Sequence, residues 1–272
     1  MPFPVIRNIV LVLGVSSLIA ISSGPALLQA QRGGRAPAAP PPAAGAPPLA
    51  AGAQDVPPTP RWPDGHVNLG ATAGAKGYWE ARPGLGTFPR AADIPLQPWA
   101  RALYQYRTAK TDLYPPQINC KPGGGPSFFL APGFEFIEIP ELKSIFQLNI
   151  AGPHSWRVIY MDGRPHPTGD ALRPTFFGHS TGKWDGDTLV IDTVGFNEKQ
   201  WITGSYPTTE QLHLTEKITR PNLKSLNYEA TIDDPGAYTA PWTIRWSITE
   251  RSASKWNDVG EMFEYICQDE RQ

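Results

Sequence analysis

The stretch FFGHSTGKWDGDTLVIDTVGF, residues Phe176–Phe196, carries the strongest structural signal in the chain. Two runs rich in β-forming residues flank Asp185-Gly186, a dipeptide that favours a tight type I′ hairpin turn. A two-residue loop at this dipeptide predicts that His179 pairs directly with Asp192. Opposed side chains of an antiparallel pair share one face, with Cβ atoms about 5 Å apart. The hairpin is therefore predicted to place an imidazole beside a carboxylate.

The register of this hairpin depends on the length of its loop. A three-residue loop, Asp185–Asp187, would instead place Thr193 opposite His179. A histidine and an aspartate on adjacent strands also often form a polar contact that only fixes the register. A structural pair therefore stands beside the chemical hypothesis.

The chain after Pro132 is predicted to be almost entirely β-strand. Alternating apolar residues, as in Leu226–Ile232 and Trp242–Ile248, are typical of half-buried antiparallel strands. We expect an all-β fold, an antiparallel up-and-down β-barrel (lipocalin/calycin-like) of about 8–9 strands, because closure removes the sheet edges. A β-sandwich is the alternative. The expected strands lie near residues 134–139, 144–150, 155–161, 176–184, 188–194, 211–219, 224–232, 241–250 and 261–267.

The N-terminal part of the chain is predicted to have three parts ahead of the barrel strands. Residues 1–30 have the apolar run and small-residue cut site of a secretory signal peptide. Residues 31–60, rich in Ala and Pro, are predicted to be a disordered linker. Residues 61–132 begin the single domain 61–272 as a segment that wraps the barrel and contains one helix.

The predicted helix covers Pro98–Lys110, and Pro98 suits its first turn. Trp99, Leu103 and Tyr106 follow the i, i+4, i+7 spacing of a helical face.

Charge and export limit the classes of partner. The formal net charge is −1, and removal of residues 1–30, which contain one Arg and no acid, leaves −2 without any basic block. Nucleic acid is therefore a poor candidate partner, and no membrane insertion of the mature chain is expected. The signal peptide predicts a periplasmic or extracellular location.

The chain has two cysteines, Cys120 and Cys267. In an oxidising compartment such a pair most often forms a disulfide, which would stabilise the fold by about 5 kcal/mol in the chain-entropy model. Two unrelated buried thiols and, less favoured, a zinc site are the alternatives.

His179 held by Asp192 would have the geometry of a general base supported by an orienting carboxylate. The chain has no G-x-S-x-G element, and Ser180 points to the opposite face from His179, so a serine hydrolase is not favoured. His213 and Tyr160 are predicted neighbours of this catalytic pair.

A ligand in the mouth or lumen of the barrel would meet further polar and aromatic residues. The candidates for binding are Arg157, Asp162, His166, Trp184 and Arg245. Tryptophans at a barrel mouth can stack on sugars or aromatic molecules, so we expect a hydrophobic, aromatic or sugar-like ligand. Turn formation by Asp162 and solvent exposure of His166 and Arg245 are the structural alternatives.

A metal site is a further alternative. His166, His179, His213 and Asp192 could supply three imidazoles and a carboxylate, a ligand set that suits zinc or iron. The spacing contains no H-x-H or H-E-x-x-H element, so the fold would have to assemble the site.

Four segments of the chain match a set of motifs. They are WRVIYMDGRPHP (Trp156–Pro167), FGHSTGKWDGDTLVIDTVGFNEKQW (Phe177–Trp201), EQLHLTEKITRP (Glu210–Pro221) and TIDDPGAYTAPWT (Thr231–Thr243). In this order they resemble the motifs DGRPHP, GHSxGxWxGDTLVxDTVGFN, LHxTE and TIDDPxAYTxPW of a family of secreted bacterial proteins of uncharacterised activity. The resemblance spans roughly residues 95–270. It implies export, one domain and pairing of the cysteines, and it implies no reaction.

The sequence thus predicts an exported barrel that binds a small organic ligand, with acid–base chemistry at His179 as a further hypothesis. A non-catalytic envelope binding or structural protein is the alternative, followed by a metal-dependent hydrolase or oxidase.

Overall fold

The computed structural model describes residues 56–72, 77–87, 89–110, 116, 120–129, 133–150, 155–202, 205–251 and 261–262. The chain divides into two units, residues 1–51 and 52–272, and every described residue belongs to the second. The predicted signal peptide, the linker up to residue 55 and Cys267 lie outside the described residues. The end of the linker is attached to the domain, since the Thr59 hydroxyl donates to the Arg220 carbonyl at 2.7 Å.

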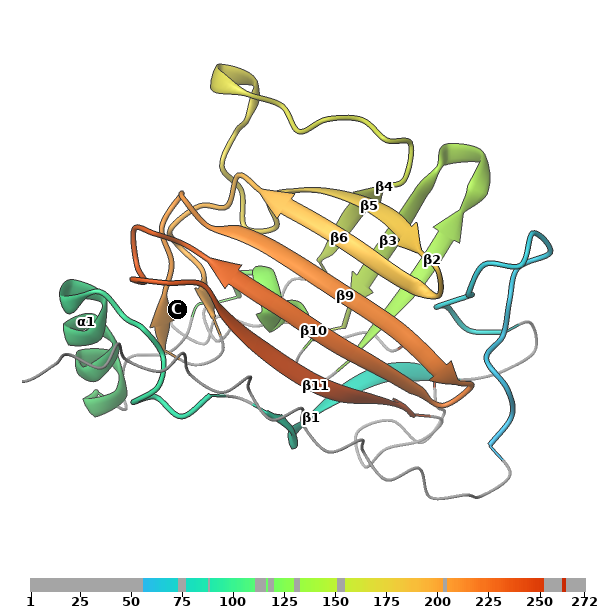
Figure 1. Cartoon of the computed structure of the whole chain (residues 1–272), viewed down its shortest axis with the longest axis horizontal. Coiled ribbons are helices and arrows are strands. Elements are labelled where there is room, and N and C mark those ends of the chain that lie inside the picture. The colour runs from blue at the N-terminus through green and yellow to red at the C-terminus, as the bar shows by residue number, and fades with distance from the viewer. Residues whose placement is uncertain are drawn as a thin grey trace, which may run out of the picture. The chain divides into compact units, whose positions relative to one another are not determined.

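Nine strands form a closed barrel in the order β1-β11-β10-β9-β6-β5-β4-β3-β2 (Figure 1). This confirms the predicted all-β barrel. The barrel strands are β1 (Tyr78–Thr87), β2 (Phe134–Ile139), β3 (Ser144–Asn149), β4 (Trp156–Tyr160), β5 (His179–Asp185), β6 (Thr188–Val194), β9 (His213–Asn222), β10 (Ser225–Asp233) and β11 (Trp242–Arg251). A separate two-stranded sheet pairs β7 (Trp201–Ile202) with β8 (Tyr206–Pro207).

The barrel differs from the expected antiparallel meander at two places. β4 and β5 are parallel, and the chain between them, residues 161–178, forms a crossover with only the short 3-10 helix η4 (Gly169–Ala171). The ninth strand is β1, from the segment expected to wrap the barrel, and it joins β2 and β11. The register of β1 shifts between Ala81 and Gly86. Its sequence therefore lacks the regular alternation of apolar residues from which a strand is predicted. Of the strand expected at 261–267, only residues 261–262 are described, and they are not in a strand.

The helix α1 (Pro98–Ala109) forms as predicted, but it presents a different face to the domain. Trp99 and Tyr106 are 46% and 55% exposed, whereas Ala100 is fully buried. Tyr104, on the same face as Ala100, stacks on Tyr206 of β8 with ring centroids 4.5 Å apart. Trp99 also contacts the domain, since its Nε1–H donates to the Gly236 carbonyl at 2.9 Å. No helix among the described residues is long and apolar enough to cross a membrane.

The predicted direct pairing of His179 with Asp192 is wrong. Asp185 pairs with Thr188, so the two loop residues are Gly186 and Asp187, and the register moves by two positions. Gly186 has a φ of 56°, whereas Asp187 is not among the described residues with positive φ. A positive φ at the first loop position only is typical of a type II′ turn with glycine at that position. This turn competes with the type I′ turn that Asp-Gly favours. His179 now pairs with Val194.

The interior of the barrel contains a charged pair in addition to its apolar core. Arg157 of β4 and Glu216 of β9 are 5% and 0% exposed and form two hydrogen bonds, of 2.6 and 3.1 Å. The Arg157 Nε–H donates to Gln147 at 2.8 Å, and the Tyr228 hydroxyl donates to Glu216 at 2.8 Å. The 3-10 helix η2 (Gly125–Phe129) is entirely buried and packs its phenylalanine rings beside the Arg157 guanidinium. A further short 3-10 helix, η3 (Pro140–Leu142), precedes β3.

We predict that Glu216→Gln lowers the free energy of unfolding by about 3–5 kcal/mol, because it leaves the buried Arg157 charge without its counter-ion. The matched control is Glu229→Gln, since Glu229 pairs with Arg245 and Lys217 at the surface and its loss should cost less than about 1 kcal/mol. Urea unfolding at pH 7 measures both variants. An equal loss of unfolding free energy in the two variants would show that the buried pair stabilises the fold no more than the surface pair does.

Candidate functional site

The candidate site lies on the outward face of β5, β6 and β9. Along β6, Ile191 and Thr193 are fully buried, while the Asp192 side chain between them is 43% exposed and therefore points away from the core. Asp192 pairs with Thr181 of β5 and with Thr215 of β9, so these three residues form one outward row across the sheet. The predicted shared face of His179 and Asp192 is retained, because a shift of two residues preserves the alternation. The site is on the barrel wall rather than in the lumen.

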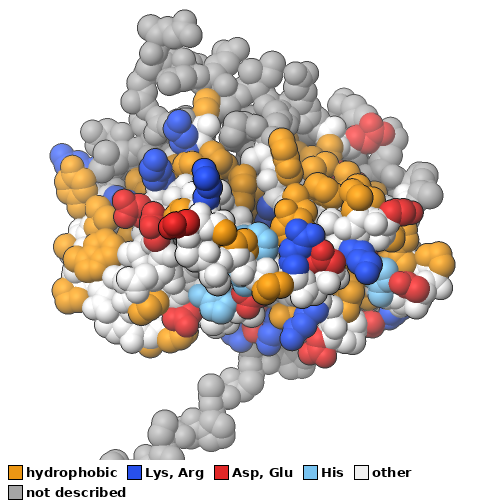
Figure 2. Space-filling model, turned by 90° about the horizontal axis from the view of Figure 1, so that it is seen from above, with side chains coloured by type: hydrophobic (Ala, Val, Ile, Leu, Met, Phe, Trp, Pro, Cys, Tyr) orange, Lys and Arg blue, Asp and Glu red, His pale blue; other side chains and the backbone are white. Residues whose placement is uncertain are grey.

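Histidines from three segments meet at the Asp192 carboxylate. His213, at the start of β9, places Nε2 2.9 Å from Asp192 Oδ1. His166, from the β4–β5 crossover, places Nε2 3.0 Å from the same oxygen and Nδ1 2.8 Å from Nδ1 of His179. The crossover runs above the barrel in Figure 1, and Figure 2, seen from that side, shows histidine side chains at the surface. We call His166, His179, Asp192 and His213 the histidine cluster.

The hydrogen-bond network assigns the ring protons of the cluster. A carboxylate only accepts hydrogen bonds, so Nε2 of His166 and Nε2 of His213 both donate to Asp192. A neutral His166 then has its lone pair on Nδ1, and His179 must donate to it from its own Nδ1. The remaining lone pair of His179 is on Nε2, which has no hydrogen bond to another described residue. A continuous relay therefore leads from Asp192 through His166 to an unpaired nitrogen of His179.

Tyr160 and Arg164 fix the position of His179. The Tyr160 ring stacks on the His179 ring with centroids 5.2 Å apart and an angle of 26° between the planes. The Arg164 guanidinium lies over the Tyr160 ring, 4.0 Å from the ring centroid. Arg164 also binds Asp162 through hydrogen bonds of 2.6 and 2.9 Å, which lower the pKa of the Asp162 carboxyl to about 2. This stack joins the end of β4 to the cluster.

The pKa of His179 is lower than the ordinary value of 6.5. Partial burial is the largest cause, because it disfavours the charged ring; a proton on His166 and the positive charge of Arg164 act in the same direction. The folded protein therefore holds His179 in its neutral form at neutral pH. Its contribution to stability is fully present above the unfolded pKa and is lost as the pH falls below 6.5 toward the depressed folded value.

We predict that Arg164→Gln raises the pKa of His179, since it removes a nearby positive charge. The C2 proton of the ring, followed by NMR between pH 4 and 8, reports this pKa. Arg245→Gln is the control, because Arg245 is exposed and bonds to Glu229 on another strand pair. A His179 titration that is unchanged by Arg164→Gln would contradict the electrostatic assignment.

The structure does not bring every predicted site residue to this cluster. Arg157 is inside the barrel, as described above, and Arg245 lies at the surface beside Glu229. Trp184 packs against the core and contacts His66, with ring centroids 5.3 Å apart. The predicted bond from Cys120 to Cys267 concerns a residue outside the described part of the chain, so it stays a prediction.

The geometry of the histidine cluster does not favour the metal alternative. Two imidazole nitrogens point directly at one oxygen of Asp192, and two others face each other, so the nitrogens do not converge on a shared empty point. No group of three or more His, Cys, Asp and Glu residues in the described part of the chain is arranged to hold a metal ion.

A fourth histidine, His66, which the sequence did not single out, joins the N-terminal segment to one end of the barrel. His66 Nδ1 lies 2.6 Å from Asp64, and its Nε2 lies 3.0 Å from Glu138 of β2. Burial lowers the pKa of His66, but the hydrogen bonds and charges of Glu138 and then Asp64 outweigh it, so the pKa lies above 6.5. Protonated His66 thus bridges two carboxylates.

We predict that this bridge weakens as the pH rises. A raised folded pKa gives a contribution to stability that is complete below pH 6.5 and is lost as the pH rises through the folded pKa. The difference in unfolding free energy between the wild type and His66→Gln should therefore shrink from pH 6 to pH 9, as measured by urea unfolding. A difference that is constant over this range would refute the role of the charged ring.

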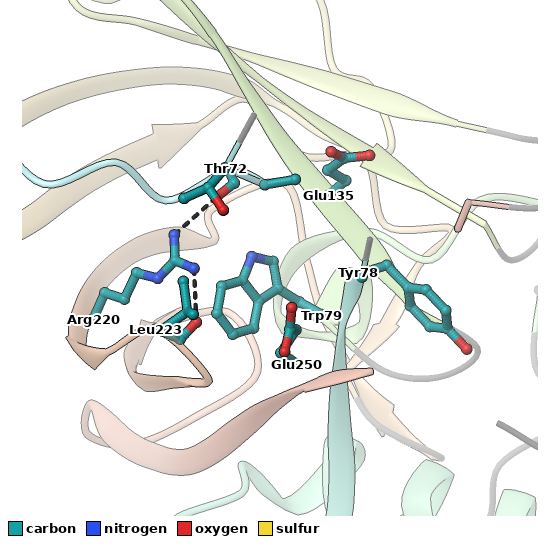
Figure 3. A pocket seen from close by; sticks show the side chains of 10 residues that line it. Thr72, Tyr78, Trp79, Glu135, Arg220, Leu223 and Glu250 are labelled. Atoms are coloured by element: carbon teal, nitrogen blue, oxygen red, sulfur yellow. Dashed lines mark hydrogen bonds between the residues drawn. The ribbon is translucent and has the colours of Figure 1, made fainter. Parts of the chain in front are cut away.

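A small pocket lies beside β1, away from the cluster (Figure 3). Arg220 donates to the carbonyls of Asn68, Gly70 and Leu223, and its buried Nε–H has no partner among the described atoms. Burial lowers the pKa of Arg220 to about 10 and raises the pKa of Glu135. The enclosed space is about 10 Å³, which is room for about one water molecule. The pocket is too small for an organic ligand.

Comparison with protein-family models, with curated proteins and with solved structures found no match to this chain.

Proposed function

We propose that the protein is an exported enzyme that acts on a small organic ligand by acid–base chemistry at the histidine cluster. The observation that carries this proposal is the relay from Asp192 through His166 to His179, which ends at an unpaired Nε2. A merely structural histidine normally uses its ring nitrogens to satisfy partners, whereas this ring keeps a lone pair available. In this proposal His179 is the catalytic base.

The relay provides a path for the proton that the base removes. When Nε2 of His179 takes a proton from the ligand, or from the water that attacks an ester ligand, the proton on its Nδ1 can move to Nδ1 of His166. The positive charge then resides on His166, whose Nε2–H donates to the Asp192 carboxylate. The reverse movement returns a proton to the product, so one site serves as base and then as acid.

Two further features suit this role. The lowered pKa of His179 keeps the base neutral at neutral pH, so it is ready to accept a proton. The stack of Tyr160 and Arg164 fixes the ring, which limits the reorganisation needed during proton transfer. His213 holds the other side of Asp192 and is a positioning residue.

The second candidate function is a non-catalytic envelope binding or structural protein. The observation that favours it is that Asp192 joins the crossover, β6 and β9 through its two histidine contacts. Such a contact by itself could serve only to hold the crossover on the barrel wall. The predicted signal peptide and the resemblance to a secreted family support export in both cases.

The test measures the hydrolysis of 4-nitrophenyl acetate by residues 31–272, purified from an export-competent host. We predict that His179→Asn lowers the rate at pH 7.5 by about 10²-fold, the usual contribution of a positioned general base, without loss of the folded state by circular dichroism. Asp192→Asn should lower the rate as well, because it disturbs the relay.

Lys183→Gln is the matched control, since Lys183 is an exposed residue on the same strand and lies outside the cluster. Equal rates for the wild type, His179→Asn and Lys183→Gln would refute the catalytic role and leave the binding or structural function.

A further inference from the structure

An apolar face lies directly beside the histidine cluster on the outside of the barrel. Along β4, Arg157 and Ile159 point inward, so the residues between and around them point outward. Trp156 is 58% exposed, and the β2 residue in the same face, Ile137, is 40% exposed. The outward residues of β2, β3 and β4 that form this face, called here the apolar ledge, are Ile137, Phe146, Leu148, Trp156, Val158 and Tyr160.

The strand register shows that the ledge is continuous. Ile137 pairs with Phe146, and Phe146 pairs with Val158, so these three side chains form one row across three strands. Leu148 pairs with Trp156 in the next outward row. Glu135 of β2 pairs with Leu148, so a carboxyl group lies at the β2 end of this second row. Figure 2 shows hydrophobic side chains gathered next to histidine side chains on this face.

The ledge meets the catalytic base at its edge. Tyr160 belongs to the ledge and also stacks on His179. In the parallel pair, Ile159 lies beside Ser180, so continuing this register by one residue places His179 level with Val158. Val158 and Tyr160 therefore bring the ledge to the His179 ring, and the Arg164 guanidinium lies over the Tyr160 ring at this edge.

The size of the ledge favours a small molecule over a protein. At about 3.3 Å per residue, the distance from Trp156 to Tyr160 along β4 is about 13 Å, and three strands span about 10 Å. The area is about 130 Å², whereas a stable protein interface needs about 800 Å² on each partner. A second copy of the chain would find too little surface here.

We infer that the ledge is the binding subsite for the apolar tail of an amphiphilic ligand, an acyl chain of medium length whose polar head group lies at His179. This inference rests on the proposed function for the role of His179, but the subsite itself depends only on the ledge. An apolar chain would remove Trp156 and Val158 from water. The head group would exchange its contacts with water for contacts with the histidine cluster. The ligand class is therefore an acyl ester or a related acyl compound rather than a sugar.

Binding is tested first, with sodium decanoate below its micelle concentration as the probe. Isothermal titration calorimetry should show binding to the wild type, and Trp156→Ser should weaken it by about tenfold, the loss expected from one apolar side chain. Tyr106→Ser is the control, because Tyr106 is an equally exposed aromatic residue on α1. His179→Asn should still bind decanoate, since the tail contacts remain.

Turnover is tested next, with 4-nitrophenyl decanoate and 4-nitrophenyl acetate. The wild type should have a lower KM for the decanoate ester than for the acetate ester, and Trp156→Ser should remove this preference. Absence of decanoate binding, or equal binding by the wild type and Trp156→Ser, would overturn the inference.

The two proposals fail in different ways. Decanoate binding that depends on Trp156, without any turnover that depends on His179, supports the subsite and refutes the catalytic function. Turnover of the acetate ester that depends on His179, with no contribution from Trp156, supports the catalytic function and refutes the subsite.

Discussion

Two parallel strands cannot be joined by a tight turn, and the candidate site depends on this constraint. β4 and β5 are the one parallel pair in the described barrel, so residues 161–178 must leave the sheet and return to it. The crossover carries His166 over the outer wall, where it fits between His179 and Asp192. An antiparallel hairpin at this position would have left the two wall residues without the imidazole that connects them. The topology of one junction thus creates the relay.

The two charged networks of the domain occupy opposite environments. Arg157 and Glu216 are sealed inside the barrel and form a bidentate pair, which suits a fixed structural role. The histidine cluster lies at the surface, where its rings can exchange protons with solvent or a ligand. The two networks are separated only by the thickness of the sheet, because Asp192 and Glu216 lie on adjacent strands and on opposite faces. Because side chains alternate between the two faces of a strand, the Arg157–Glu216 pair and the histidine cluster lie on opposite sides of the sheet.

Alternation of apolar residues made much of the fold predictable from the sequence. Tyr228, Ile232, Ile244 and Ile248 are buried on the faces that their spacing indicated. β1 could not be predicted from the sequence, because its bulge and glycines interrupt the two-residue alternation of apolar side chains. No pattern in the sequence indicated that one strand pair is parallel. For the site, the shared face of His179 and Asp192 was predictable, but the turn at Gly186 moved the register and removed their direct contact. The central position of His166 depends on the path of the crossover, which no local pattern encodes.

Closure of the barrel joins the first strand to the last. β1 pairs with β11, so residues near 78 lie beside residues near 251. Contacts between residues so distant in sequence form late, because a long loop must close before they stabilise the chain. Until β11 has joined, β1 and β10 each keep an open edge with unpaired backbone groups. The barrel therefore cannot close while β11 is still being synthesised, and the domain stays open along one seam until synthesis of the chain is nearly complete.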